Sequence, residues 1–351
     1  MSLQDPRGPE AGLRELDWLL TPEDAAPAFT RAGIRADRVE PTYVRLKPGR
    51  GAIVGYVLRG SDQDGEPVTL PAYARTFTDD HVRIVVDKWG GSRPVATPLG
   101  PGFVPLEGGQ TVLFVFPNDS QLRGLRKLDR IVSELEELLS DEFSVERGTT
   151  ALTPVRYKPE RRFIASASVG MRRGAGLDNS AFFLRLFADT RAERLAKLAA
   201  AVRSNGGSSL VPRPFGPILR GRVFVEEQVE GEEYLTAVLA GGGDPSALAD
   251  ALSRLHACAP AFVEPIGPAV VLDTLSGALE AASALDPGVA TAAQEVMERL
   301  AGLLPPDKAS GLVHGDMALH NVLDARSGPV IVDLERSRMG DSLQDVGKVV
   351  A

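Results

Sequence analysis

A degenerate internal repeat is the sequence feature that most restricts how this chain can fold. Residues 42–58 read TYVRLKPGRGAIVGYVL and residues 153–169 read TPVRYKPERRFIASASV, which share the pattern V-R-[LY]-K-P-x-R at an offset of 111 residues. In each copy two strand-like runs flank a Lys-Pro turn, as in a β-hairpin. AYARTF also matches FFLRLF, and VLFVF matches RVFVE, both at an offset of 110 residues. The first half therefore reads as a degenerate copy of the sheet module that follows, although shared strand propensity can also produce similar hairpins.

The second copy and the residues after it indicate a sheet-rich region followed by helices. The copy reads strand, strand, strand, helix, strand, strand, and the helix TRAERLAKLAAAVRS has Thr190 available as an N-cap. After Gly231 the pattern becomes helical, with Asp244 and Pro245 placed as the cap and first-turn proline of a further helix. A small mixed sheet joined to a helical lobe favours a cleft between them, where small-molecule sites commonly lie.

Composition and charge exclude several classes of protein. The chain has 351 residues, of which 43% are hydrophobic and 25% charged, which is ordinary for a globular protein. Its net charge of −8 argues against nucleic acid as a partner, because binding a phosphate backbone needs a basic surface. Cys258 is the only cysteine, the amino terminus lacks the pattern of a signal peptide, and no run of about 18 apolar residues occurs. We therefore expect a cytoplasmic protein that binds neither nucleic acid nor membranes.

The segment GLVHGDMALHNVLDARSGPVIVDLE, residues 311–335, sets polar residues among short apolar runs. Asp316 and Asn321 follow one such run, and Asp333 follows another. Two short strands that end beside each other would bring these side chains together. Carboxylate and carboxamide oxygens suit Mg²⁺, which takes the rest of its ligands from water and substrate phosphates. Asp316 would then be free to orient a hydroxyl and accept its proton.

This segment resembles the catalytic region of the aminoglycoside phosphotransferase-like kinases, which are small-molecule kinases with the protein-kinase fold. The resemblance rests on HGDMALHN, the DLE after it, and GD at residues 340–341 followed by Asp345. LSRLHA, residues 252–257, is similar to the helix before the catalytic loop, and VFVEEQVEGEE is similar to the hinge between the lobes. The likeness spans roughly residues 148–351. It implies an enzyme that uses ATP and Mg²⁺ to phosphorylate a hydroxyl of a small polar molecule, such as a sugar, amino sugar or aminoglycoside.

The resemblance also implies roles for individual residues. Asp316 matches the catalytic base, and Asn321 and Asp333 match the residues that hold Mg²⁺ between the β- and γ-phosphates. Glu335 is either a second metal ligand or the partner in a salt bridge. Adenine would meet backbone groups of the hinge, which comprises Glu227, Gln228 and Val229.

Two features depart from the family pattern. Relatives place a lysine on the third strand, where it reaches the α- and β-phosphates and pairs with a helix glutamate; here FFLRLF offers Arg185, with Glu193 as its candidate partner. Arginine presents a planar fork of donors, so this replacement is not conservative. Lys158 in RYKPERR is the alternative cation for the phosphates. Family members also continue for several helices after the GD segment, so we expect a C-lobe that is incomplete or lacks the usual acceptor-binding helices.

These patterns predict an α+β, protein-kinase-like bilobal fold preceded by an extra α+β domain that partly repeats the N-lobe. We expect a tail and short helix in residues 1–25, a cap or scaffold domain in 26–147 with a connecting helix over 119–139, the kinase N-lobe in 148–230 and the helical C-lobe in 231–351. The first copy has no H-G-D-x-x-x-x-N segment of its own, so it cannot be a complete kinase. Because of Arg185, a catalytically weak nucleotide-binding scaffold, or pseudokinase, is the alternative. The acceptor, the choice between ATP and GTP, and the oligomeric state stay open.

Overall fold

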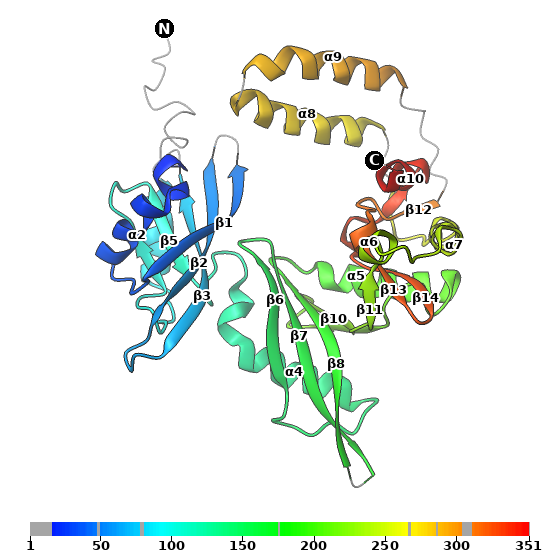
Figure 1. Cartoon of the computed structure of the whole chain (residues 1–351), viewed down its shortest axis with the longest axis horizontal. Helices are drawn as coiled ribbons and strands as arrows, with labels where there is room; N and C mark the ends of the chain where they lie inside the picture. Colours follow the sequence, from blue (N-terminus) through cyan, green and yellow to red (C-terminus); the bar gives the residue numbers. More distant parts are fainter. Residues whose placement is uncertain are drawn as a thin grey trace. The chain divides into compact units, whose positions relative to one another are not determined.

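Two compact units make up the chain (Figure 1). The computed structural model describes residues 16–47, 50–77, 81–174, 176–265, 268–285, 287–303 and 311–350. Unit 1 comprises Met1–Leu128, Arg156–Phe163 and Glu280–Pro287, and unit 2 comprises Asp129–Val155, Ile164–Leu279 and Gly288–Ala351. The tail expected at the amino terminus lies, over residues 1–15, outside the described residues.

Unit 1 is built on a five-stranded antiparallel sheet with the strand order β1-β2-β3-β5-β4. Its strands are β1 (Arg38–Lys47), β2 (Gly51–Ser61), β3 (Pro67–Thr76), β4 (Phe103–Pro105) and β5 (Thr111–Val115). Two helices accompany the sheet, α2 (Pro22–Arg31) and α3 (His81–Gly90).

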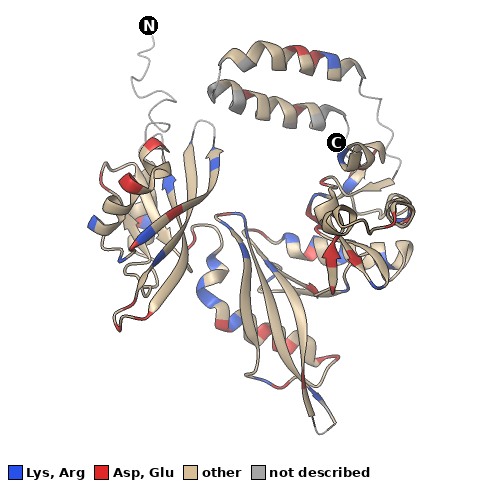
Figure 2. Ribbon diagram, in the orientation of Figure 1, with Lys and Arg blue, Asp and Glu red and all other residues tan. Residues whose placement is uncertain are grey.

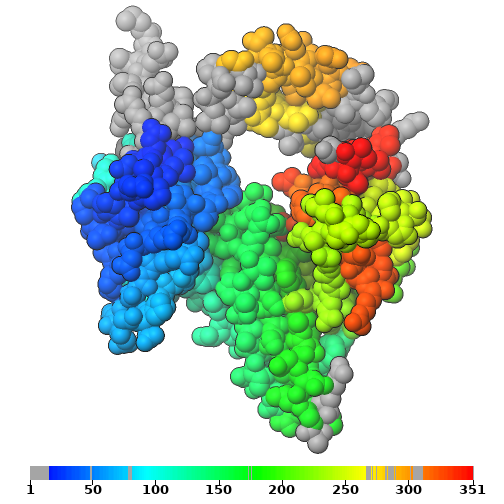
Figure 3. Space-filling model, viewed as in Figure 1, coloured from blue at the N-terminus to red at the C-terminus, as the bar shows by residue number. Residues whose placement is uncertain are grey.

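Two hydrophobic cores form on this sheet, because successive strand residues point to opposite faces. In one core Phe29 of α2 packs against Tyr56, with ring centroids 5.1 Å apart. In the other, Trp89 of α3 packs edge-on against Phe114 at 4.9 Å. The space-filling view shows the blue-to-cyan elements of unit 1 in close packing (Figure 3). Burial of large aromatic rings on both faces thus stabilises unit 1.

The tip of the following hairpin, residues 156–163, also belongs to unit 1. Its turn carries Glu160, which has a positive φ of 58° and a side chain that is 1% exposed. The Glu160 carboxylate accepts hydrogen bonds from Lys47 Nζ at 2.5 Å, Arg75 Nη1 at 2.8 Å and Ser120 Oγ at 2.6 Å. Arg45 Nη2 lies 3.6 Å away. A single buried carboxylate is therefore surrounded by three cations.

Unit 2 contains a second five-stranded sheet, with the order β6-β7-β8-β10-β9. Its strands are β6 (Ala151–Lys158), β7 (Arg162–Arg173), β8 (Gly176–Phe187), β9 (Pro214–Ile218) and β10 (Val223–Glu227), and the tips of β6 and β7 lie in unit 1. Helix α5 (Arg191–Gly206) follows β8 and buries Leu195, Leu198 and Val202, the face that its sequence predicts. Thr190 stands at its N-cap, although its side chain makes no capping hydrogen bond.

Short strands and several helices follow β10. They are β11 (Gly231–Glu233), α6 (Tyr234–Leu239), α7 (Pro245–His256), α8 (Pro268–Leu285), α9 (Pro287–Leu303), β12 (Gly311–Val313), β13 (Val322–Ala325), β14 (Gly328–Ile331), β15 (Arg338–Gly340) and α10 (Leu343–Val350), with 3₁₀ turns η2 (Leu319–Asn321) and η3 (Leu334–Arg336). The short strands form the sheet β11-β13-β14 and the pair β12-β15. One core joins α5, α7 and the β12–β14 region, including Leu198, Leu255, Leu312 and Ile331.

The expected fold class is confirmed: an α+β, protein-kinase-like order of elements follows an additional sheet that repeats it in part. The two five-stranded sheets have equivalent strand orders, and each has a helix after its third strand. Asp244 caps α7 by accepting a hydrogen bond from Ser246 N at 2.9 Å, as predicted.

The connecting helix is shorter than the sequence predicts. A helix was expected over residues 119–139, but the Asp119 carboxylate accepts hydrogen bonds from the backbone N–H groups of Gln121 and Leu122, and this holds a turn. The helix begins as η1 (Arg123–Lys127) and continues as α4 (Leu128–Ser140). Within the described ranges, no helix has both the length and the hydrophobicity needed to cross a membrane.

Candidate active site

The β13–β14 hairpin places Asn321 and Asp333 at the same end of a strand pair. Asn321 directly precedes β13, and Asp333 follows β14 by two residues. The strands pair Val322 with Ile331, and Val332 N donates to Asn321 O at 2.9 Å. The backbone of Asp333 is left-handed, with φ 65° and ψ 53°, a conformation that aspartate tolerates better than most residues. Strand register therefore brings together two polar residues that are 12 positions apart.

The loop that carries Asp316 is tied to the same hairpin through a buried histidine. His314 Nε2 lies 2.8 Å from Val332 O, and His314 Nδ1 accepts a hydrogen bond from Asp316 N at 3.3 Å. A carbonyl oxygen can only accept, so Nε2 carries the proton. Burial lowers the pKa of the His314 imidazole, consistent with a neutral ring. His314 therefore braces the loop by hydrogen bonding.

Asn321 is bonded directly to this loop. Its carboxamide nitrogen donates to Asp316 O at 2.9 Å, which fixes the orientation of the amide and turns its oxygen to the other side. The Asp316 side chain is 50% exposed and lies 3.4 Å from Lys348 Nζ and 3.7 Å from Arg336 Nη1. The structure thus brings Asp316, Asn321 and Asp333 into one connected group, with the Asp316 carboxylate accessible.

The Asp345 side chain of α10 is hydrogen-bonded to the backbone of the Asp316 loop. Its buried carboxylate accepts hydrogen bonds from His314 N at 2.6 Å and Gly315 N at 2.9 Å, and lies 3.1 Å from His256 Nε2. Burial pushes the pKa of Asp345 up, but these hydrogen bonds outweigh it and the pKa is lowered. Asp345 therefore fixes the backbone of the Asp316 loop from the start of α10.

Gly315 meets a steric requirement of the same loop. Its φ is +78°, and a Cβ atom added there would lie 2.4 Å from Arg336 O. Only glycine fits both the backbone conformation and this close approach. The backbone conformation and the close packing of this loop therefore require a glycine at the second position of the H-G-D motif.

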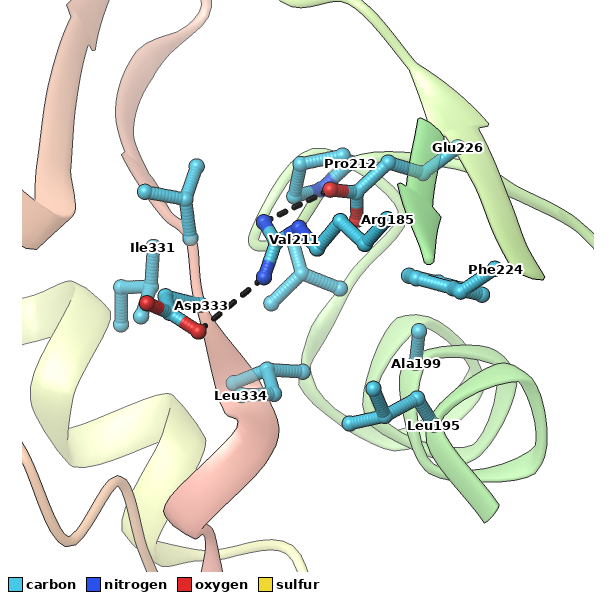
Figure 4. Close-up of a pocket in the computed structure, with 11 residues that line it drawn as sticks. Arg185, Leu195, Ala199, Val211, Pro212, Phe224, Glu226, Ile331, Asp333 and Leu334 are labelled. Carbon is cyan, nitrogen blue, oxygen red and sulfur yellow. Dashed lines mark hydrogen bonds and ion pairs between the residues drawn. The ribbon is translucent and has the colours of Figure 1, made fainter. Parts of the chain in front are cut away.

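Arg185 of β8 lies between two carboxylates (Figure 4). Its guanidinium is 2.7 Å from Glu226 Oε1 and 3.1 Å from Asp333 Oδ1, and only 5% of the residue is exposed. The three side chains line a small pocket whose floor is apolar, formed by α5, β10 and the β14–η3 segment. Figure 4 shows Arg185 reaching across this pocket from the sheet toward Asp333. A third-strand arginine is thereby joined to the candidate metal site.

The expected pairing of Arg185 with Glu193 is not the arrangement found. Glu193 lies in the first turn of α5, where its carboxylate is beside Gly221; a Cβ atom at that glycine would be 2.5 Å from Glu193 Oε1. Glu226 is closer to Arg185 because β10 pairs with β8 and sets Phe224 opposite Arg185, so Glu226 is the diagonal neighbour on the same face.

Sequence reasoning missed Glu226. Burial raises the pKa of its carboxyl group despite the adjacent arginine, and the charge of Asp333 adds to the effect. A detectable signal was present: VFVEE ends with two glutamates, and strand alternation requires one of them to face inward. Recognising Arg185 as its partner required the register of β8 and β10.

The remaining predicted residues are distributed as follows. Glu335 lies 4.0 Å from Arg191 Nη1, an ion pair that leaves its metal-binding alternative open. Glu227 and Gln228 are exposed at the end of β10, and Val229 is half-buried. The Gln228 side chain accepts a hydrogen bond from Ser166 Oγ at 2.5 Å. Lys158 ends β6 and belongs to unit 1, whereas Arg185 belongs to unit 2.

The donor set fits a magnesium ion that is shared with phosphates. Asn321 and Asp333 offer carboxamide and carboxylate oxygens, the ligand type that Mg²⁺ prefers. Among the residues described, no group of three or more His, Cys, Asp or Glu side chains is arranged to hold a metal. Two protein residues suffice where water and substrate supply the other ligands, so these residue types fit an ion that is shared with a substrate.

Comparison with known proteins gives the family. Solved structures to which this chain is similar include choline kinase from Cryptosporidium parvum Iowa II, with 13% identity over 63% of this chain and 68% of that chain and a TM-score of 0.45. A choline/ethanolamine kinase family protein from Mesorhizobium loti has 20% identity over 63% of this chain and 69% of that chain, with a TM-score of 0.41. No curated protein matches the sequence. The family model of the phosphotransferase enzyme family (APH) matches residues 173–351, more than half of the chain, and the chain therefore belongs to that family.

Proposed function

We propose that this chain is an ATP-dependent kinase that transfers a phosphoryl group to a hydroxyl of a small polar molecule, such as a sugar, amino sugar or aminoglycoside. The observation that carries the proposal is the connected group formed by Asp316, Asn321 and Asp333 in a chain of the phosphotransferase family. Phosphoryl transfer depends mainly on positioning and on neutralising phosphate charge, and this group can provide both.

Asp316 is the proposed catalytic base. Its carboxylate is half exposed, so an acceptor hydroxyl can reach it, while its backbone is held by His314 and Asn321. A base must lie within hydrogen-bond reach of the proton that it accepts, and a braced loop maintains that geometry. Lys348 Nζ also donates to Gly315 O at 2.7 Å, which adds a further tie to the loop.

Asn321 and Asp333 are the proposed ligands of Mg²⁺. When bound, the ion would neutralise charge on the nucleotide phosphates. Asp333 is held by Arg185 and by the turn into η3, and Asn321 is oriented by its bond to Asp316 O, so both oxygens are positioned by the protein itself. Glu335 stays either a second ligand or the partner of Arg191.

Arg185 is the proposed contact for the nucleotide phosphates, because its guanidinium already bonds the carboxylate proposed to hold the metal. Adenine would lie against the hinge backbone at Glu227, Gln228 and Val229. Lys158 as an alternative phosphate contact stays a prediction. Glu193, in the first turn of α5, has no direct contact with the nucleotide in this proposal.

The acceptor can be either neutral or cationic. Glu230, Glu232 and Glu233 are exposed at β11, where Glu232 pairs with Asp324 of β13 in the backbone register, and Figure 2 shows the red acidic residues there. Such a run is compatible with a cationic acceptor, but acidic runs commonly lie on solvated surfaces. A neutral sugar is therefore an equally suitable acceptor.

Turnover of ATP with Mg²⁺ against a panel of sugars, amino sugars and aminoglycosides tests the proposal. The wild-type chain is expected to form ADP in step with one class of acceptor. Asp316→Asn is expected to lower that rate about 10²–10⁴-fold, because the variant lacks the base.

Asp250→Asn is the matched control, since Asp250 is an exposed aspartate on α7 that has no part in the proposed site. It is expected to keep the wild-type rate. Turnover that survives in Asp316→Asn would refute the assignment of the base, and no turnover with any acceptor would favour a nucleotide-binding scaffold.

A further inference from the structure

The guanidinium of Arg185 forms ion pairs with two carboxylates that come from different parts of the fold. Glu226 comes from β10, the neighbouring strand of the same sheet, whereas Asp333 comes from the turn after β14 (Figure 4). Both bonds are partly or fully buried, with the Glu226 side chain 7% exposed and the Asp333 side chain 23% exposed. Arg185 therefore joins the sheet module to the candidate metal site.

The bond to Glu226 is fixed by sheet register. In β8 and β10, Arg185 pairs with Phe224 and Phe183 pairs with Glu226, so Arg185 and Glu226 share a face as diagonal neighbours. Strand pairing sets their separation independently of α5, which carries Glu193. An anchor on the sheet is a rigid support for a long side chain.

The first copy of the module shows that this glutamate is not required by the sheet. There the equivalent strands pair Arg75 with Val112 and Tyr73 with Phe114, so the strand register puts Phe114 at the place of Glu226. The sequence offset of 110 had matched Glu226 with Phe116 instead, two residues away. Phe114 is fully buried in an aromatic core. Replacing a buried ion pair by hydrophobic residues is often neutral or stabilising, so a buried glutamate calls for a reason other than stability.

We propose that Glu226 is the positioning residue that holds Arg185 for the nucleotide phosphates, in place of a helix glutamate. This inference rests on the proposed function and deepens it. Arg185 can exchange its bond to Asp333 for phosphate oxygens while it keeps its bond to Glu226. Asp333 is then released to its proposed metal-binding role without loss of the guanidinium's position.

Affinity for Mg²⁺-ADP, measured by calorimetry on the full chain, tests this without any acceptor. Glu226→Gln is expected to weaken binding roughly tenfold, within the range found for coupled neighbours. Arg185→Met is expected to weaken binding at least as much. In the Arg185→Met background, adding Glu226→Gln is expected to change the affinity by less than about twofold, since Glu226 acts through Arg185.

The melting temperature separates positioning from a merely structural role. Glu226→Gln removes a buried charge, so it is expected to melt no lower than the wild type while binding nucleotide more weakly. Glu146→Gln is the matched control: Glu146 pairs with Arg172 of β7 in the same unit, but at the surface. It is expected to leave affinity unchanged.

Wild-type affinity in Glu226→Gln, or a second tenfold loss on adding it to Arg185→Met, would overturn the inference and leave the proposed function standing. A wild-type chain that does not bind Mg²⁺-ADP would overturn the proposed function, and the inference with it. If Glu226→Gln does not fold, Glu226→Asp serves instead, because the shorter carboxylate keeps the charge but not the reach. It is expected to bind Mg²⁺-ADP more weakly, and wild-type affinity would count against the inference.

Discussion

Arg75 in the first sheet and Arg185 in the second occupy equivalent strand positions but have different partners. Arg75 bonds Glu160, a carboxylate that receives two further cations within unit 1. Arg185 bonds Glu226 and also Asp333, which follows a strand outside its own sheet. The same arginine therefore has an internal structural role in one copy and a connection to the candidate active site in the other. The partners, rather than the arginine, distinguish the two copies.

The pKa values of the two buried glutamates shift in opposite directions. Burial raises the pKa of Glu160, but Arg75 and the hydrogen bonds from Lys47 and Ser120 outweigh it, so the pKa is lowered. Burial also raises the pKa of Glu226, and there Arg185 does not outweigh it. Glu160 is a carboxylate stabilised by excess positive charge, whereas Glu226 shares its cation with another acid.

The largest effect is expected from removing the structural carboxylate. Glu160→Ala leaves Lys47, Arg45 and Arg75 around an empty position, and is expected to lower the free energy of unfolding by about 3–5 kcal/mol, the cost of breaking a buried pair. Urea unfolding of the full chain, monitored by hydrogen exchange in peptides from unit 1, measures this change in unfolding free energy. A change below about 1 kcal/mol would show that the cluster behaves like exposed pairs.

Loss of the second arginine is expected to affect activity more than stability. Arg185→Met removes a cation proposed to stabilise phosphate charge, so kcat/KM is expected to fall about 10²–10³-fold, or about 2.7–4 kcal/mol. Steady-state kinetics with the acceptor found in the panel measure it. A variant that keeps wild-type kcat/KM would place Arg185 in the same structural class as Arg75.

Loss of the first arginine is expected to give the reverse pattern. Arg75→Met leaves Glu160 with Lys47 and Arg45, so the cost in unfolding free energy is expected to be smaller, about 1–3 kcal/mol. Turnover by the folded fraction is expected to equal that of the wild type. A fall in kcat/KM comparable with that of Arg185→Met would remove the distinction between the two copies.

The smallest effect is expected from pH. Glu160 has a lowered pKa, so it adds stability above about pH 4.5 that is lost as the pH falls through its folded value. Glu226 has a raised pKa, so stability is lost as the pH rises from about 4.5 through its folded value. The melting deficit of Glu160→Gln should therefore shrink on acidification. Glu226→Gln should gain on the wild type as the pH rises, and parallel curves for the two variants would contradict these signs.

Local sequence patterns predicted much of the fold, because individual hairpins and helices are marked by the residues within them. The repeated V-R-x-K-P-x-R motif predicted two similar hairpins, and both appear with equivalent strand orders. The Asp244-Pro245 pair predicted the start of α7. At Asp119 the sequence pattern predicted a helix, but the carboxylate accepts hydrogen bonds from two backbone N–H groups and forms a turn. The periodicity of apolar residues does not reveal such a hydrogen bond.

The site was predictable where spacing along the chain determines contact. Asn321 and Asp333 flank a short hairpin, so strand pairing alone brings them to one end. The partner of Arg185 depends instead on the register between β8 and β10, and the bond from Asp345 to the Asp316 loop depends on where α10 packs. Such contacts follow from tertiary packing, which a single sequence does not specify by spacing.

The central claim is that Asn321 and Asp333 together bind a metal-bound triphosphate beside Asp316. Its most direct test is the affinity of the full chain for ATP, measured with and without Mg²⁺. The wild type is expected to bind ATP more tightly when Mg²⁺ is present, and Asp333→Asn and Asn321→Ala are expected to lose most of that gain. A gain from Mg²⁺ that is the same in all three proteins would contradict the account.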